Sequence, residues 1–329
     1  MTISRITLVL SIIAFEVGLA SPVLADPLSG EILKFQQLPL NSGLGPSLGG
    51  APYEGHDVFS TAYPGPVPGT YVGRFAADDF SDNFSAPVVH VKWWGSYQNN
   101  VTGTNGVQNF LISFESDQPV QPGTTFSHPN QPLLNQIVTA GPLSPASGTF
   151  TESLINSNVT EDLYQYNAEL AFPFPQQADV VYWLKIVAMV DPNNDGNIAW
   201  GWHNRDWGIQ DLLASAVPVP GEFDEGPVTN TAGNPTSVWH FQDDAVDGQV
   251  TITGNAAFPP QPIVSQSSMA PLLYLENGGT FPTDGPSGIE LLSEDLAFEL
   301  YTVPEPTTMS MAMIGMTAIL LARSKRRPR

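Results

Sequence analysis

The chain contains no cysteine among its 329 residues. This absence excludes disulfide bonds, thiolate metal ligands and a cysteine nucleophile. Since 42% of the residues are hydrophobic and 10% are aromatic, the chain can still bury a core, so its stability must come from packing or from bound ions. The 29 glycines and 31 prolines require many turns, which favours short strands.

Basic residues are scarce, and most of them lie at the ends of the chain. Residues 26–302 contain only five lysines and arginines against 30 acidic residues, a net charge of −25. Such a field repels nucleic acid and favours cations and mutual repulsion between copies, so we expect no nucleic-acid partner. Adaptation of the surface to a saline medium explains the same composition.

Motifs of the common enzyme classes are also missing. The sequence has no H-E-x-x-H, no Walker loop and no dinucleotide-binding glycine motif. The five histidines lack the spacing of zinc ligands. Paired acids such as Asp78-Asp79 and Asp243-Asp244 point to opposite faces if they lie in strands. We therefore expect no catalytic residues and no obligatory cofactor.

The first 25 residues have the pattern of a signal peptide. Arg5 precedes an apolar run over residues 6–14, and Val23-Leu24-Ala25 offers the small residues that signal peptidase reads. Cleavage after Ala25 leaves Asp26 first. A buried helix is the alternative, but Pro22 and Pro27 bracket the site.

The C-terminal residues 303–329 combine three features. Val303, Pro304, Glu305 and Pro306 are followed by an apolar stretch over residues 309–322 and by a basic end. This arrangement resembles the PEP-CTERM sorting signal, which implies recognition by an exosortase and removal of the tail at the cell surface or in an extracellular polysaccharide matrix. The apolar stretch is shorter than the ~20 residues of a bilayer span, so we expect a transmembrane helix that anchors transiently, its basic end cytoplasmic. An ordinary single-pass anchor is the alternative.

Between the ends, strand periodicity dominates. Apolar and polar residues alternate over Val89–Trp93, Phe110–Glu115 and Tyr164–Phe172, as in half-buried strands. Residues 180–190 are apolar on both faces except at Lys185, which predicts a central, covered strand. We predict an all-β fold, a two-sheet antiparallel β-sandwich that is jelly-roll-like.

The expected organisation is a signal peptide over 1–25, a Gly/Pro-rich lead-in over 26–69, the sandwich domain over 70–302 and the sorting tail over 303–329. A loose stretch over 217–236 is read as a surface loop within this domain, with a boundary between two domains as the alternative.

A series of short motifs in order resembles an exported domain family of unknown function, frequent in planctomycete-type bacteria. The motifs are Gln36, Ala77-Asp78-Asp79-Phe80, Trp93-Trp94-Gly95-Ser96-Tyr97, Ser127-His128-Pro129, Tyr182-Trp183-Leu184, Gly201-Trp202, Asp244-Ala245-Val246 and Asp295-Leu296-Ala297-Phe298. The departures are Phe35, where that family usually shows tryptophan, and an acidic insertion over 222–225. The resemblance covers residues 31–302 and implies a β-sandwich, but it assigns no activity.

Two candidate binding sites follow from the residues. Trp94, with His90 and Lys92 on the polar face of its predicted strand, is the candidate for stacking on a sugar ring of extracellular polysaccharide. The other reading places tryptophans such as Trp200 and Trp202 in the core.

Asp191, Asn193 and Asp195 occupy positions one, three and five of a calcium-type loop. Position twelve is Trp202 instead of a bidentate acid, although a distant carboxylate such as Asp206 could complete the shell. A plain turn explains the same residues.

These features predict an exported, exosortase-sorted protein of the cell surface or extracellular matrix with a structural or adhesive role. The alternatives are a carbohydrate-binding module and, behind it, a glycan-active enzyme that uses two carboxyl groups.

Overall fold

The computed structural model describes residues 30–39, 57–119, 126–156, 162–205, 245–254, 261–272 and 295–303. In chain order the strands are β1 (Ile32–Gln37), β2 (Asp57–Phe59), β3 (Thr61–Pro64), β4 (Thr70–Phe80), β5 (Val88–Tyr97), β6 (Asn109–Gln118), β7 (His128–Ala140), β8 (Thr149–Asn156), β9 (Leu163–Phe174), β10 (Tyr182–Met189), β11 (Trp200–His203), β12 (Val246–Thr253), β13 (Ile263–Pro271) and β14 (Phe298–Thr302). A single 3-10 turn, η1 (Gln98–Asn100), follows β5, and these ranges contain no α-helix.

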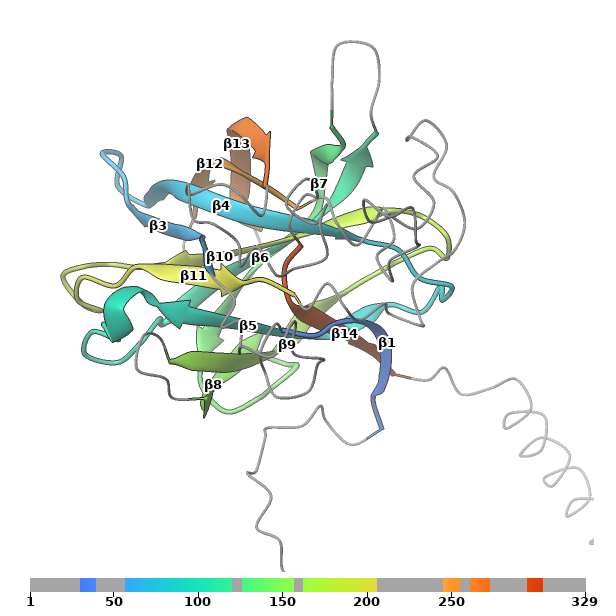
Figure 1. Ribbon diagram of the computed structural model, residues 1–329, viewed down its shortest axis with the longest axis horizontal. Coiled ribbons are helices and arrows are strands. Elements are labelled where there is room, and N and C mark those ends of the chain that lie inside the picture. The colour runs from blue at the N-terminus through green and yellow to red at the C-terminus, as the bar shows by residue number, and fades with distance from the viewer. Residues whose placement is uncertain are drawn as a thin grey trace, which may run out of the picture.

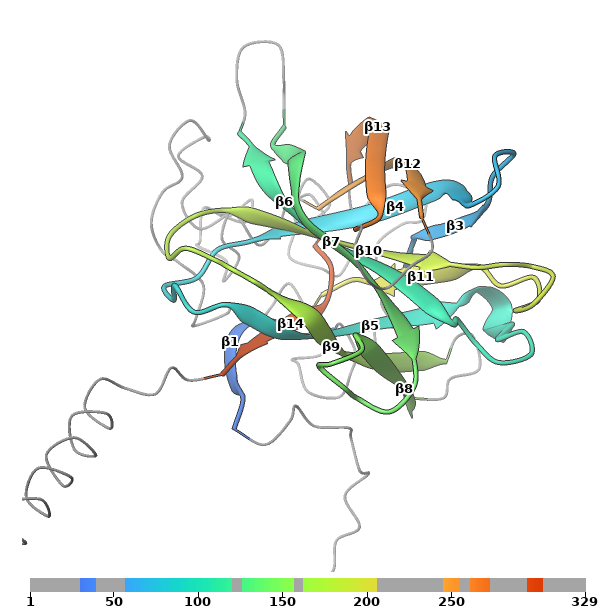
Figure 2. The same cartoon turned by 180° about the vertical axis from the view of Figure 1, so that it is seen from behind.

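Hydrogen bonds join the strands into one 14-stranded sheet that folds over on itself. The first layer contains β1, β14, β5, β9 and β8, with β11 beside β5 and β2 beside β11; the second contains β7, β6, β10, β3 and β4 (Figures 1 and 2). Side chains of both layers pack in one hydrophobic core. The predicted all-β class is confirmed, and both layers of the expected sandwich are present, although they are parts of one continuous, mixed sheet.

Two corners join the layers. At one, β7 and β8 form a parallel pair through Thr139↔Thr149 and Ala140↔Phe150. At the other, β2 pairs with β11 in the first layer, and β3 pairs with β4 and β10 in the second. Ser60 lies between β2 and β3 with its backbone N–H 3.1 Å from Trp200 O and its hydroxyl 2.5 Å from Ile186 O. This buried serine therefore links both layers at the crossing.

Aromatic side chains fill the space between the layers. Trp93 stacks on Tyr166 with ring centroids 5.3 Å apart, and Phe110 meets Trp200 edge-on at 4.9 Å. Trp200 and Trp202 are fully buried, so the reading that placed them in the core is confirmed.

A second hydrophobic cluster covers the outer face of the second layer. It includes Trp183 and Val187 of β10 and Val250 and Val264 of the β12–β13 hairpin. All eight residues of β10 are buried, which confirms the central, covered strand predicted from residues 180–190.

The described residues correct the predicted domain limits. Residues 26–69, expected as a lead-in, contain β1, β2 and β3, and β1 closes the edge of the first layer by pairing with β14. These strands are short and lie between stretches rich in glycine and proline, so the sequence shows no clear alternation of apolar and polar residues there. Residues 217–236 connect parts of one sheet. The strands β12 and β14, which follow this stretch, pair with β4 and β5, which precede it.

No helix of these ranges is long and apolar enough to cross a membrane. The signal peptide and the apolar stretch over 309–322 lie outside the described residues.

Gly95 allows β5 and β11 to approach closely. A Cβ atom on Gly95 would lie within 3.0 Å of the carbonyl oxygen of Gly201 and of the Trp200 ring. Backbone cannot move aside as a flexible side chain can. We predict that Gly95→Ala lowers the free energy of unfolding by about 3 kcal/mol or prevents folding, as measured by urea denaturation.

Gly141→Ala is the matched control, because the nearest atom to its added Cβ is a Thr149 methyl group at 3.8 Å. It should change stability by less than about 1 kcal/mol. Equal losses in both variants would show that the close approach is not what Gly95 provides.

Candidate functional site

The outer face of the first layer carries a row of polar side chains. His90, Lys92 and Trp94 alternate with the core-facing residues of β5, and their partners on β9 are Glu169, Asn167 and Gln165. His90 and Asn167 are fully buried, and Trp94 is 2% exposed. This polar face is therefore shielded from solvent.

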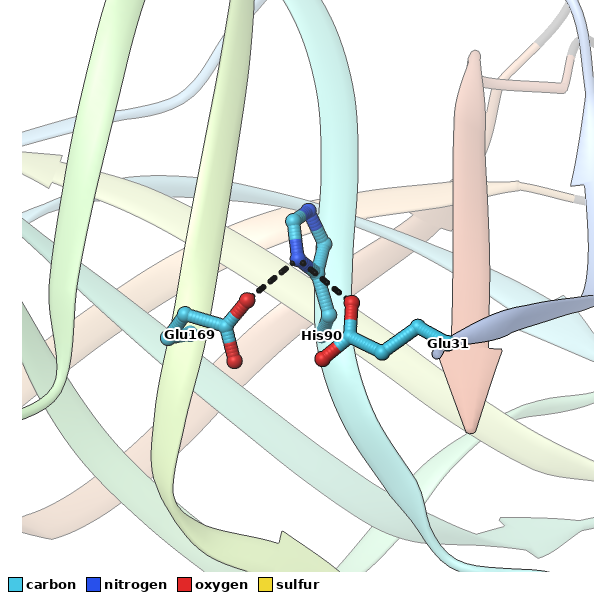
Figure 3. Close-up of side chains that lie close together, drawn as sticks. All are labelled: Glu31, His90 and Glu169. Carbon is cyan, nitrogen blue, oxygen red and sulfur yellow. Dashed lines mark hydrogen bonds and ion pairs between the residues drawn. The ribbon is translucent and has the colours of Figure 1, made fainter. Parts of the chain in front are cut away.

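His90 is the centre of this row (Figure 3). Its Nδ1 atom lies 2.8 Å from Glu169 Oε1 and 3.3 Å from Glu31 Oε2. Its Nε2 atom lies 3.3 Å from Asn167 Oδ1. Because Glu31 immediately precedes β1, the cluster ties the first strand of the domain to β5 and β9.

Two carboxylates control the charge of His90. Burial lowers the pKa of His90, but the hydrogen bonds and charges of Glu169 and Glu31 outweigh it, so the pKa is raised above its ordinary value. The carboxylates thus favour the imidazolium form. Among the described residues, Glu31, His90 and Glu169 are the one group of three such side chains whose ligand atoms all lie within 4.8 Å of one another, so they could also hold a metal ion.

A lysine continues the row beside His90. Lys92 Nζ lies 2.7 Å from Glu299 Oε2 and 3.1 Å from the Tyr301 hydroxyl. The Tyr301 ring meets the His90 ring edge-on, with centroids 5.2 Å apart. The β14 strand therefore contributes directly to the cluster, two residues before the sorting tail begins.

Every lysine and arginine between residues 26 and 302 forms an ion pair. The pairs are Lys34–Asp82, Arg74–Asp247, Lys92–Glu299, Lys185–Glu115 and Arg205–Asp295. Only the Arg74 side chain is largely exposed, at 54%. The few positive charges of the domain are thus neutralised by its own carboxylates.

Lys34 lies where the chain crosses between the layers. Its Nζ atom is 3.1 Å from Asp82 Oδ2, 2.6 Å from Gln176 Oε1 and 2.9 Å from the carbonyl oxygen of Ala86. Burial lowers the pKa of Lys34 and raises that of Asp82, and their attraction opposes both shifts. This one ammonium group therefore joins β1 to the β4–β5 and β9–β10 connections.

The adjacent acids Asp78 and Asp79 do not form a paired carboxyl site. Asp78 lies on the same face of β4 as Ala76 and Phe80, which point into the core. Its carboxylate accepts hydrogen bonds from the backbone N–H of Leu296 at 2.7 Å and of Asp79 at 2.9 Å. Asp78 therefore links β4 to the start of β14. Asp243 and Asp244 lie outside the described residues.

Tyr97 is another buried polar residue whose hydroxyl group is hydrogen-bonded. Its hydroxyl donates to Glu152 and accepts from the backbone N–H of Val107 at 3.0 Å. Burial raises the pKa of Tyr97 far above its ordinary value, so the hydroxyl stays protonated and acts as a structural donor.

The expectation that Trp94, His90 and Lys92 form an exposed sugar-binding face is wrong. Trp94 packs with Leu163 and Ala297, and His90 is fully buried among carboxylates. Alternation along a strand separates its two faces, but it does not show whether the polar face meets solvent.

We predict that Trp94→Ala lowers the free energy of unfolding by ~3 to 5 kcal/mol, because it removes a buried indole ring. Thermal and urea unfolding of the purified protein measure this loss. Phe84→Ala is the control, since Phe84 is 39% exposed. If the Trp94 variant were as stable as the Phe84 variant, the Trp94 ring would not be buried, and it would again be a candidate for the surface.

In the predicted calcium loop, the oxygens accept hydrogen bonds from the loop itself. Asp191 Oδ1 accepts from the backbone of Asn193 at 3.0 Å, and Asp191 Oδ2 accepts from the Asn194 amide at 2.7 Å. Asp195 Oδ2 accepts from the backbone N–H of Asp191 at 2.8 Å. These bonds are those of a closed turn. Calcium binding by Asp191, Asn193 and Asp195 stays a prediction; Asp206 lies outside the described residues.

Val303 follows β14 directly and is 51% exposed. Pro304, Glu305 and Pro306 lie outside the described residues.

Residues 33–254 match the family described as domain of unknown function DUF7901. The chain belongs to this family. Residues 302–327 match the PEP-CTERM protein-sorting motif, so the DUF7901 protein is an exported substrate of exosortase sorting. No curated protein and no solved structure matches it. The DUF7901 match includes His90 and Glu169, whereas Glu31 and β14 lie outside it.

Sequence reasoning missed Glu31 and Glu169 as partners of His90. The available signal was the polar series Gln165, Asn167 and Glu169 on a strand that also carries core residues. The strand that lies next to this polar series depends on the strand order of the sheet. That order cannot be deduced from a single sequence.

Proposed function

We propose that the mature DUF7901 domain has a structural or adhesive role at the cell surface or in the extracellular matrix and performs no catalysis. The observation that carries this proposal is that all five lysines and arginines of the domain are paired with its own carboxylates. The outward charge is consequently acidic, which keeps a surface hydrated and keeps copies apart.

The arrangement of the chain ends supports a sorted surface protein. Ile32 pairs with Thr302, so β1 and β14 lie side by side at the edge of the first layer (Figure 1). Both ends of the mature chain leave the domain at this edge. A transient C-terminal anchor would then hold the rest of the domain facing away from the membrane.

The carbohydrate-binding alternative depended mainly on Trp94. Since this ring is buried, the described residues offer it no support at that position.

The role is tested with purified mature protein added to cells that lack it and to a glycan array. We expect saturable retention by matrix-bearing cells and no release of sugar products. Hydrolysis of any matrix glycan would overturn the non-catalytic role, and failure to be retained by cells or matrix would overturn the structural or adhesive one.

Processing gives a separate prediction. Mass spectrometry of the native surface protein should find a chain that starts at Asp26 and ends near Pro304 to Pro306, because both terminal signals are removed. Replacing Pro304, Glu305 and Pro306 together by alanine should leave the tail attached. An intact Arg329 on the bulk of the wild-type surface protein would contradict removal by exosortase and leave a permanent anchor.

A further inference from the structure

We propose that Glu31, His90 and Glu169 bind one divalent transition-metal ion, with Zn²⁺ as the probe, and that this ion fastens the N-terminal strand to the first layer. This inference is independent of the role proposed for the whole domain.

The ligand atoms already have a suitable spacing. His90 Nδ1 lies 2.8 Å from Glu169 Oε1 and 3.3 Å from Glu31 Oε2. Around a tetrahedral zinc ion with bonds of ~2.0–2.2 Å, neighbouring ligand atoms lie about 3.3 Å apart. An ion can therefore replace the proton between Nδ1 and the carboxylates with only small movements of the side chains.

The environment of His90 also matches that of a metal ligand. Metal-bound histidines donate their second ring N–H to a fixed acceptor, which leaves the other nitrogen free for the metal. Asn167 Oδ1, 3.3 Å from Nε2, is placed to be that acceptor. With the proton on Nε2, the lone pair of Nδ1 points at the two carboxylates.

Unsatisfied polar atoms lie next to the cluster. Asn167 is fully buried and contacts the His90 ring, yet its Nδ2 atom has no hydrogen-bond partner. Thr151, the partner of Asn167 on β8, has a buried hydroxyl that is equally unsatisfied. Buried donors and acceptors are normally paired, so these atoms point to a bound water on the Nε2 side of the ring, which would hold Asn167 in place as the acceptor of the Nε2 proton.

The ligand types select the metal. One imidazole and two carboxylates suit zinc and its neighbours in the first transition series. Calcium prefers six to eight oxygen ligands, and this site offers too few. Two carboxylates also balance the charge of a divalent ion, and the three ligands come from different segments, so the ion would cross-link them.

The test compares mature wild-type protein with Glu31→Gln and His90→Gln variants, each measured in chelator and in a small excess of zinc chloride. We expect wild type to retain about one zinc ion per chain after dialysis and to unfold at a higher temperature with zinc than in chelator. Magnesium or calcium at the same concentration should produce no such rise. Both variants should lose the bound ion and the zinc-dependent rise.

His203→Gln is the matched control. His203 lies on the same layer, with its Nδ1 atom 3.0 Å from Asp57 Oδ1, but among the described residues it belongs to no group of three side chains that could hold a metal ion. This variant should keep the zinc-dependent rise even if its stability in chelator falls. If Glu31→Gln does not fold, Glu169→Gln supplies the same readout. The proposal is overturned if wild type binds no zinc, or if the cluster variants retain the wild-type zinc content and temperature rise, which would indicate adventitious binding to the acidic surface.

Discussion

The buried ion pairs of four basic residues, Lys34, Lys92, Lys185 and Arg205, hold together a domain that is otherwise strongly acidic. Lys34 joins three segments at a crossing between the layers, and Arg205 lies 3.0 Å from Asp295, which itself lies 3.3 Å from the amide of Gln37 in β1. Lys185 contacts both Glu115 of β6 and Gln266 of β13, so it fixes the β12–β13 hairpin over the second layer. Such pairs add little net stability, because desolvation offsets attraction, but loss of one partner is expensive. The ion pairs therefore specify which segments pack against one another, and they contribute less to the net free energy of unfolding.

The features that followed from the sequence are those that depend on local alternation. The core faces of β5, β6 and β9, the doubly covered β10 and the buried Trp200 and Trp202 can be read from the spacing of apolar residues. The PEP-CTERM sorting signal can also be read locally, because a short linear pattern defines it.

The features that did not follow depend on partners far apart in the chain. His90 and Glu169 are 79 residues apart, and Lys34 and Gln176 are 142 apart. A polar residue in a strand suggests a solvated face unless its partner is known, which is why the sequence alone favours a surface position for Trp94 and His90. In the predicted calcium loop the residue types suggest an ion site. The structure shows that their oxygens accept hydrogen bonds from amides of the loop itself.

The buried cations, and not the exposed one, hold the segments of this domain together. Urea denaturation of the five single methionine replacements at Lys34, Arg74, Lys92, Lys185 and Arg205 tests it most directly. The account predicts losses of ~3 to 5 kcal/mol for Lys34, Lys185 and Arg205, whose pairs are fully buried, a smaller loss for Lys92, and less than about 1 kcal/mol for Arg74. Small and equal losses at all five positions would contradict it.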